Sequence, residues 1–329
     1  VGKIDPVKME PWDQEHRHHH LNSRALNHKG DAISSRVPLF FNSDVILSKA
    51  TASDSMDYLY RNGHHDECLF IHGGKGTLKT NFGTLKLTYG DYAIIPRGVI
   101  WQLDVDEPLE LFIVETHGPI ETPNRYRNTL GQLLEHAPYS ERDIRTPEFE
   151  TLHSEGSIEV KVRLAQGLQS YEYKNHPFDL VGWDGYYFPW VFNVNDFMPI
   201  TGKVHQPPPV HQVFQAPGLV ICNFVSRLFD YHPEAVPSPY AHSNVDSDEI
   251  LYYVAGDFMS RKGVEHGSIT YHPMGLPHGP QPGKIEASLG AKEANEIAVM
   301  VDTFKPLKMT TGAAGIDQPN YPLSWLDES

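Results

Sequence analysis

The chain has 329 residues, of which 40% are hydrophobic and 11% aromatic, and this suits one large or two ordinary globular domains. Its formal net charge of −15 argues against nucleic acid as a partner, because an acidic protein repels the phosphate backbone. Two cysteines, no long apolar run and no hydrophobic signal core in residues 1–16 argue against a disulfide framework, a membrane partner and export, so we expect a cytoplasmic protein.

The first 38 residues are polar and are expected to form an irregular N-terminal segment. They include a cluster of histidines at His16, His18, His19 and His20. Adjacent histidines on an exposed segment need not converge on one ion, and no carboxylate stands at a matching spacing. We therefore predict no specific metal site in residues 1–38.

Short β-segments begin at Leu39. Residues 39–118 contain apolar or alternating runs, such as DECLFIHGG and DYAIIP, that are cut by glycine and proline. Glycine and proline at this spacing are typical of the turns between barrel strands, so residues 39–118 are expected to form an N-terminal barrel. Residues 119–160 are rich in proline and charge, and they predict a connector with a short helix at residues 129–137.

β-patterned sequence resumes after the connector and defines a second barrel at residues 161–304. Its clearest strands are EILYYVAGDF and GSITYHP. Residues 305–329 bear prolines and are expected to pack on the surface as a tail. Because long helical periodicity is absent from the sequence, we predict an all-β fold with two barrel-like halves.

The two halves share the same spacing of glycine, proline and acidic residues, which indicates an internal repeat of one barrel unit. The matching patterns are Gly90-x5-Pro96-x-Gly98-x2-Trp101 with Gly267-x5-Pro273-x-Gly275-x2-His278, and Glu67-x6-Gly74 with Glu249-x6-Gly256. Trp101 stands where His278 stands, and an indole cannot ligate a metal. We therefore interpret the first barrel as a structural copy without a full metal set. A rival site at His64, His65 and Glu67 lacks a distant third ligand.

The second barrel carries three candidate metal ligands, His242, Glu249 and His278. Two imidazoles and one carboxylate make the set that holds non-haem Fe(II) and leaves coordination positions open. A register slip of one residue would replace Glu249 by Asp248. The six-residue spacing to Gly256 favours Glu249.

Three further polar residues belong to the predicted site. Asn244 is either a weak additional ligand or a hydrogen-bond partner of a ligating group. His205, in KVHQPPPVH, and His272, six residues before His278, are candidate catalytic residues. A neutral imidazole is suited to take a phenolic proton near pH 7.

These motifs resemble the paired motifs of the cupin superfamily, with Asn244 in place of the usual second histidine. The segment HPFDLVGWDGYYFPWVFNVNDFM, with PYAHSN, the stretch from Glu249 to Gly256 and PHGP, is similar to the homogentisate 1,2-dioxygenase family. The likeness runs from about Asn42 to Thr303. It implies a bicupin of two double-stranded β-helix (jelly-roll) barrels with loop elaborations, whose C-terminal barrel is catalytic and binds Fe(II).

The resemblance also implies an activity. The family opens a para-dihydroxylated aromatic ring with O₂, converting homogentisate to maleylacetoacetate in aromatic catabolism and tyrosine degradation. Carried over by position, His242, Glu249 and His278 hold the iron, His205 deprotonates the substrate, and His272 contacts a substrate hydroxyl or bound oxygen. The expected partners are a small aromatic diphenol and O₂, and the family implies a homo-oligomer of trimers that pair into hexamers.

Two departures from the family bear on the substrate. The chain has one residue more than the family between His242 and Glu249. A family tyrosine that helps to bind the substrate carboxylate falls at Phe258, and losing such a donor to a charged group costs ~1.5–3 kcal/mol. Ring cleavage of a hydroquinone or gentisate is therefore an alternative. Two others are a non-redox Zn²⁺ or Mn²⁺ cupin enzyme, such as an isomerase, and a non-catalytic bicupin.

Overall fold

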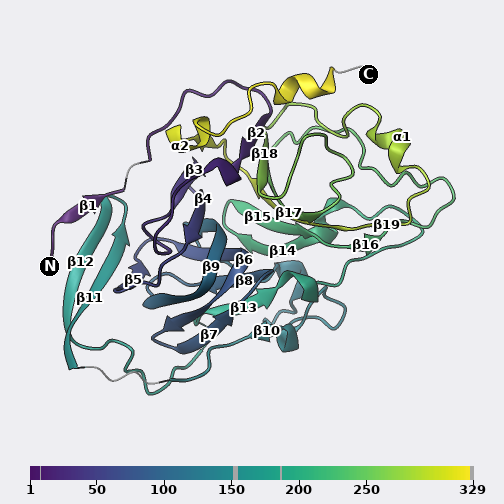
Figure 1. Cartoon of the computed structure of the whole chain (residues 1–329). Helices are drawn as coiled ribbons and strands as arrows, with labels where there is room; N and C mark the ends of the chain where they lie inside the picture. The colour runs from purple at the N-terminus through teal and green to yellow at the C-terminus, as the bar shows by residue number, and fades with distance from the viewer. Residues whose placement is uncertain (8, 151–154, 186, 327–329) are drawn as a thin grey trace. The chain divides into compact units, whose positions relative to one another are not determined.

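The computed structural model describes residues 1–7, 9–150, 155–185 and 187–326, which form two compact units (Figure 1). The first unit comprises the described residues of 1–11, 28–120 and 141–196, and the second those of 12–27, 121–140 and 197–329. The prediction of an all-β fold is confirmed. In the described ranges the α-helices are limited to α1 (Lys284–Ser288) and α2 (Thr311–Ala314).

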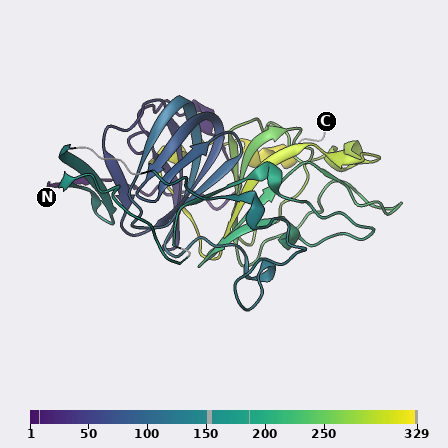
Figure 2. The ribbon, with the colours of Figure 1, turned by 90° about the horizontal axis from the view of Figure 1, so that it is seen from below.

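The first unit is built around two long antiparallel strands, β6 (Asp66–Thr80) and β9 (Trp101–Thr116), which lie side by side in both views (Figure 2). Their inward residues form a core in which Trp101 is fully buried. The remaining strands of this unit are β1 (Ile4–Pro6), β3 (Val37–Phe41), β4 (Val45–Ala52), β5 (Leu59–Asn62), β7 (Gly83–Leu87), β8 (Asp91–Ile95), β10 (Ile144–Arg145), β11 (Glu155–Leu164), β12 (Gly167–Asn175) and β13 (Trp190–Asn193).

The second unit contains a six-stranded sheet in the order β14-β15-β20-β17-β18-β2. These strands are β2 (His19–Asn22), β14 (Gln212–Ala216), β15 (Leu219–Phe224), β17 (Asp248–Gly256), β18 (Ser268–His272) and β20 (Glu296–Thr303). Short strands β16 (Arg227–Leu228) and β19 (Glu293–Ala294) pair beside it. Because residues directly opposite each other share a face of the sheet, Glu249 lies between His272 on β18 and Asp302 on β20.

Strand register reproduces the internal repeat. Glu67 is paired with Glu115 in the first unit as Glu249 is paired with Asp302 in the second. Gly74 and Gly256 have φ angles of 86° and 96°, which favour glycine. A Cβ at Gly74 would overlap the carbonyl oxygen of Pro108 in β9, and one at Gly256 would overlap that of Asn295, just before β20. Both units therefore contain the same arrangement, in which a strand bends sharply at a glycine beside its antiparallel partner strand.

Three expectations differ from the structure. The segment 1–38 contains strands β1 and β2, because the unpaired edges of β12 and β18 bond to them. Residues 161–196 belong to the first unit, where β11 pairs with β5 and β13 pairs with β8. The helix expected at 129–137 is absent. The Asn128 side chain there accepts the backbone N–H groups of Leu130 and Gln132, which favours a turn.

Among the described residues, no helix is long and apolar enough to cross a bilayer.

Candidate metal centre

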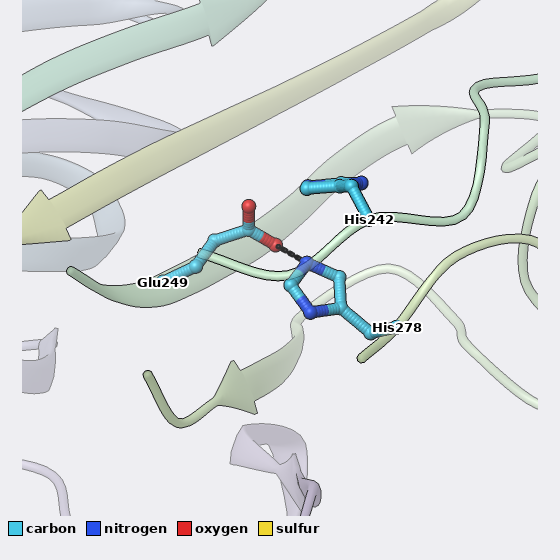
Figure 3. Close-up of side chains that lie close together, drawn as sticks. All are labelled: His242, Glu249 and His278. Carbon is cyan, nitrogen blue, oxygen red and sulfur yellow. Dashed lines mark ion pairs between the residues drawn. The ribbon is translucent and has the colours of Figure 1, made fainter. Parts of the chain in front are cut away.

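Three side chains that are distant in sequence meet in the second unit. One ligand atom each from His242, Glu249 and His278 lies within 4.8 Å of the other two (Figure 3). The backbones of His242 and His278 exchange two hydrogen bonds of 2.8 Å, which bring the two histidines together outside any long strand. Strand β17 supplies Glu249.

The backbone determines which ring nitrogen of each histidine is free. Nδ1 of His242 lies 3.1 Å from the carbonyl oxygen of Tyr240, and Nδ1 of His278 lies 3.2 Å from that of Leu276. A carbonyl oxygen only accepts, so both Nδ1 atoms carry the proton and both Nε2 atoms keep a lone pair. Nε2 of His278 is buried without a hydrogen-bond partner, 3.5 Å from Oε1 of Glu249. Two acceptors that face each other in this way fit a cation between them.

Glu249 is held in its charged form. Nδ1 of His272 donates to Oε1 at 2.7 Å, and Nδ2 of Asn244 donates to Oε2 at 3.2 Å. Burial is the largest single influence and opposes the charge, but the interactions with His272 and His278 together outweigh it and hold the pKa of Glu249 well below its usual range. Burial lowers the pKa of His272 to about 3, so this imidazole is neutral. One carboxylate and neutral imidazoles together suit a divalent transition metal.

The neighbours of Glu249 bear on two alternatives left open by the sequence. Asn244 bonds the carboxylate, as the second of its two predicted roles requires. Asp248 faces away, where it accepts from the Tyr271 hydroxyl at 3.0 Å. Asp302 lies opposite Glu249, and burial, with the charge of Glu249, raises its pKa well above the usual range. Glu249 is therefore the carboxylate that lies beside His242 and His278.

The histidine cluster of the N-terminal segment reaches this site, contrary to expectation. His19 and His20 lie in β2 and are 0% and 8% exposed. His18 comes one residue before the last pair of the β2–β18 ladder. Its ring centroid lies 5.3 Å from that of His272 and 5.9 Å from that of His278. The HHLN run has no alternating pattern that would signal a strand, and nothing local identifies β18 as its partner.

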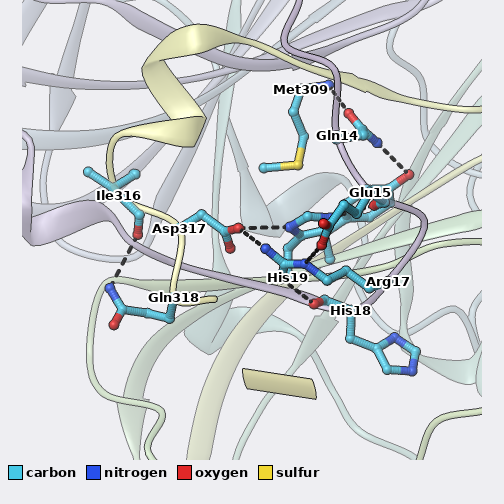
Figure 4. Close-up of polar contacts among 10 residues, drawn as sticks. Gln14, Glu15, Arg17, His18, His19, Met309, Ile316, Asp317 and Gln318 are labelled. Atoms are coloured by element: carbon cyan, nitrogen blue, oxygen red, sulfur yellow. Dashed lines mark hydrogen bonds and ion pairs between the residues drawn. The ribbon is translucent and has the colours of Figure 1, made fainter. Parts of the chain in front are cut away.

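Polar contacts hold this N-terminal segment in place (Figure 4). Arg17 and His19 both bond Asp317, at 2.5 and 3.0 Å. Nε2 of His18 donates to the carbonyl oxygen of Pro277, next to His278, at 3.0 Å. The segment is thereby attached to the loop that carries a candidate ligand.

Two predicted residues stand apart from the three candidate ligands. His205 is 65% exposed at its side chain and lies 3.5 Å from Asp230. Its ring contacts Tyr240, whose ring in turn contacts His242. Phe258 packs edge-on against Tyr253, with centroids 4.8 Å apart. Neither is among the residues that surround Glu249.

The equivalent position of the first barrel is filled by protein. Nη1 of Arg36 lies 2.6 Å from Oε1 of Glu67, and the Trp101 indole donates to Oε2 at 3.2 Å. His65 contacts the ring of His117. Within the described residues, the ligand-forming group of His, Cys, Asp and Glu side chains is the one in the second barrel. The rival site near Glu67 has no support.

Comparison with known proteins gives the family. A model of the homogentisate 1,2-dioxygenase N-terminal region matches residues 41–194. A protein of Saccharolobus solfataricus that is named as a dioxygenase is 43% identical to this chain over 329 residues. The match covers 99% of this chain and 85% of the other protein.

The chain belongs to the homogentisate dioxygenase family. Homogentisate 1,2-dioxygenases of Rhodopseudomonas palustris and Nitrobacter hamburgensis are 27% and 28% identical to it, over 79% of this chain. The chain spans 61% of the length of each. Among solved structures, a cupin barrel protein of Leptotrichia buccalis aligns with a TM-score of 0.42 and 12% identity, over 92% of this chain and 99% of its own. This homogentisate dioxygenase family member has two β-rich units, in agreement with the two barrels that the sequence predicted.

Proposed function

We propose that this protein is an Fe(II)-dependent dioxygenase that opens the ring of a para-diphenol with O₂. The observation that carries the proposal is the convergence of two Nε2 lone pairs and a charged carboxylate at His242, His278 and Glu249. Three ligands leave positions for a phenolate and for O₂. Family membership supports homogentisate as the substrate. It also supports an assembly of trimers that pair into hexamers and a cytoplasmic role in tyrosine degradation.

The residues around the ligands have separable roles in this proposal. Bound Fe(II) supplies the redox chemistry that couples an electron-rich ring to O₂. His272 and Asn244 orient the two carboxylate oxygens of Glu249, so that the ligand is preorganised. His205 lies 3.5 Å from Asp230 and is the candidate that takes a phenolic proton. Because His205 is exposed, it would act on a substrate entering from solvent.

Oxygen uptake tests the proposal directly. Anaerobically purified protein is loaded with Fe(II) and given homogentisate, gentisate or hydroquinone, and O₂ consumption is followed together with ring-opened product. We expect uptake with at least one of the three and none after replacement of Fe(II) by Zn²⁺. Turnover of a substrate without O₂, or activity with redox-inert Zn²⁺ alone, would instead establish a non-redox enzyme.

A further inference from the structure

The loop that carries His278 is held on both sides by side chains from distant parts of the chain. Nε2 of His18 donates to the carbonyl oxygen of Pro277 at 3.0 Å. The Trp325 indole donates to the carbonyl oxygen of Gly279 at 3.3 Å. Pro277 and Gly279 are the residues directly before and after His278. The two peptide groups that flank this candidate ligand are therefore tied to different segments, residues 12–22 and residues 316–326, which we call the N-terminal arm and the C-terminal arm.

The two arms are also joined to each other. Backbone hydrogen bonds of 3.0 and 2.8 Å connect β2 with residues 316–318, on the edge of β2 that does not face β18. Asp317 also binds the Arg17 guanidinium at 2.5 Å (Figure 4). The rings of His18 and Trp325 have their centroids 5.2 Å apart. A displacement of either arm would therefore disturb the other arm and both contacts to the loop.

The position of His278 depends on contacts of this kind. It lies in a loop, where a two-residue bridge joins it to His242, and its Nδ1 bonds the carbonyl oxygen of Leu276 in the same loop. A side chain on a loop is held less precisely than one on a strand or helix. Groups that fix the orientation of a ligand typically strengthen metal binding about 10- to 100-fold. The arms are thus placed to supply what a strand supplies to Glu249.

We propose that the two arms together position His278 as a metal ligand, with His18 and Trp325 as positioning residues. This inference rests on the proposed function for the presence of the metal. Coupling between two binding events is reciprocal. If docking of the arms raises metal affinity by about 10- to 100-fold, bound metal stabilises the docked arms by the same factor.

Chelator competition with Co²⁺ tests the role of His18. Co²⁺ accepts imidazole and carboxylate ligands, and its visible absorption reports their geometry. We expect His18→Ala to weaken Co²⁺ binding about 10- to 100-fold and to change the absorption spectrum. His18→Gln keeps an N–H donor near the place of Nε2 and should restore most of the affinity. Trp325→Phe should cause a smaller loss, because Arg261 still donates to the carbonyl oxygen of Gly279.

Gln14→Ala is the matched control. Gln14 lies in the N-terminal arm, and its Nε2 donates to the carbonyl oxygen of Leu307 at 3.2 Å, a contact of the same kind as that of His18. The other partners of its side chain are Met309 and Tyr271, which lie outside the loop of His278. Gln14→Ala should lower the melting temperature and leave the Co²⁺ affinity unchanged. Unchanged affinity in His18→Ala would overturn the inference, as would an equal loss of affinity in Gln14→Ala.

Hydrogen exchange on the unaltered protein tests the reciprocal effect and does not depend on the folding of any variant. Exchange is measured by mass spectrometry on peptides that cover residues 17–22 and 316–326, with and without Co²⁺. We expect bound Co²⁺ to slow exchange in both arms by about 10- to 100-fold, and His18→Ala to reduce this protection. Exchange that is independent of Co²⁺ in both arms would overturn the inference.

Failure of this inference can be told apart from failure of the dioxygenase assignment. Oxygen uptake with a diphenol, combined with unchanged Co²⁺ affinity in His18→Ala, would defeat the role of the arms alone. Weaker Co²⁺ binding in His18→Ala, without O₂ uptake by the Fe(II)-loaded unaltered protein, would support the role of the arms and defeat the dioxygenase. A chain that binds neither Co²⁺ nor Fe(II) would defeat both.

Discussion

Replacing Arg36 by methionine should destabilise the first barrel substantially. Nη1 of Arg36 lies 2.6 Å from Glu67 and 3.8 Å from Glu115, and the three side chains are 9%, 1% and 5% exposed. Arg36→Met removes the cation but leaves two buried carboxylates beside each other. Breaking a buried ion pair on one side typically costs about 3–5 kcal/mol of unfolding free energy. We expect a loss in this range at pH 7.5, measured by urea denaturation.

The pH dependence of this loss identifies its cause. Burial already raises the pKa of Glu67, and Arg36 opposes that rise. Without Arg36 the folded-state pKa of Glu67 rises further above its unfolded value, so the folded variant binds a proton more readily than the unfolded chain. The deficit should therefore shrink as the pH falls from 7.5 to 5.

A second substitution provides the control for this experiment. Arg36→Met combined with Glu67→Gln removes the buried anion as well as the cation, and it should recover most of the lost free energy. A change below about 1 kcal/mol in Arg36→Met would refute the reasoning, since exposed ion pairs are worth that little. So would a deficit that does not vary with pH.

Three other predictions concern the second unit. Asn244→Ala removes the donor to Oε2 of Glu249 and should weaken metal affinity about 10- to 100-fold in a chelator competition, whereas unchanged affinity would mean that the contact does not orient the ligand. Gly256→Ala places a Cβ against the Asn295 carbonyl oxygen at a φ of 96° and should cost roughly 1–3 kcal/mol or more, seen as a lower melting temperature. His272 is neutral when buried, with a pKa of about 3 against 6.5, so the stability it contributes is present above pH 6.5 and falls as the pH drops toward 3. His272→Gln should flatten the acid limb of a plot of unfolding free energy against pH for the metal-free protein, and an unchanged limb would contradict this.

Sequence patterns predicted the features that depend on local backbone geometry. Glycine and proline spacing located the repeated strands, since a glycine such as Gly256 is required where the chain bends against its neighbour. The spacing of Glu249 and His278 from these glycines then predicted two of the three candidate ligands. Each of these inferences uses residues of one hairpin.

Contacts between distant segments could not be predicted in this way. His18 reaches His272 because β2 occupies the free edge of β18, about 250 positions later in the chain, and no motif encodes that pairing. Arg36 reaches Glu67 from a segment that has no distinguishing spacing. The prediction of a helix at 129–137 was wrong for a local reason. The Asn128 side chain accepts the backbone N–H of Gln132 and so competes with helical hydrogen bonds.

The two barrels show that charge balance, as well as ligand type, separates the copy suited to a metal from the structural copy. Each barrel has an acidic residue at the same place in its sheet, Glu67 or Glu249, and each must neutralise it. In the first barrel Arg36 provides a fixed positive charge and Trp101 a donor, so the carboxylate is satisfied by the chain itself. Around Glu249 backbone carbonyls hold the imidazoles of His242 and His278 with their Nε2 lone pairs free, which suits a cation from outside the chain. Restoring a histidine at Trp101 alone would therefore create no metal site while Arg36 still occupies the carboxylate.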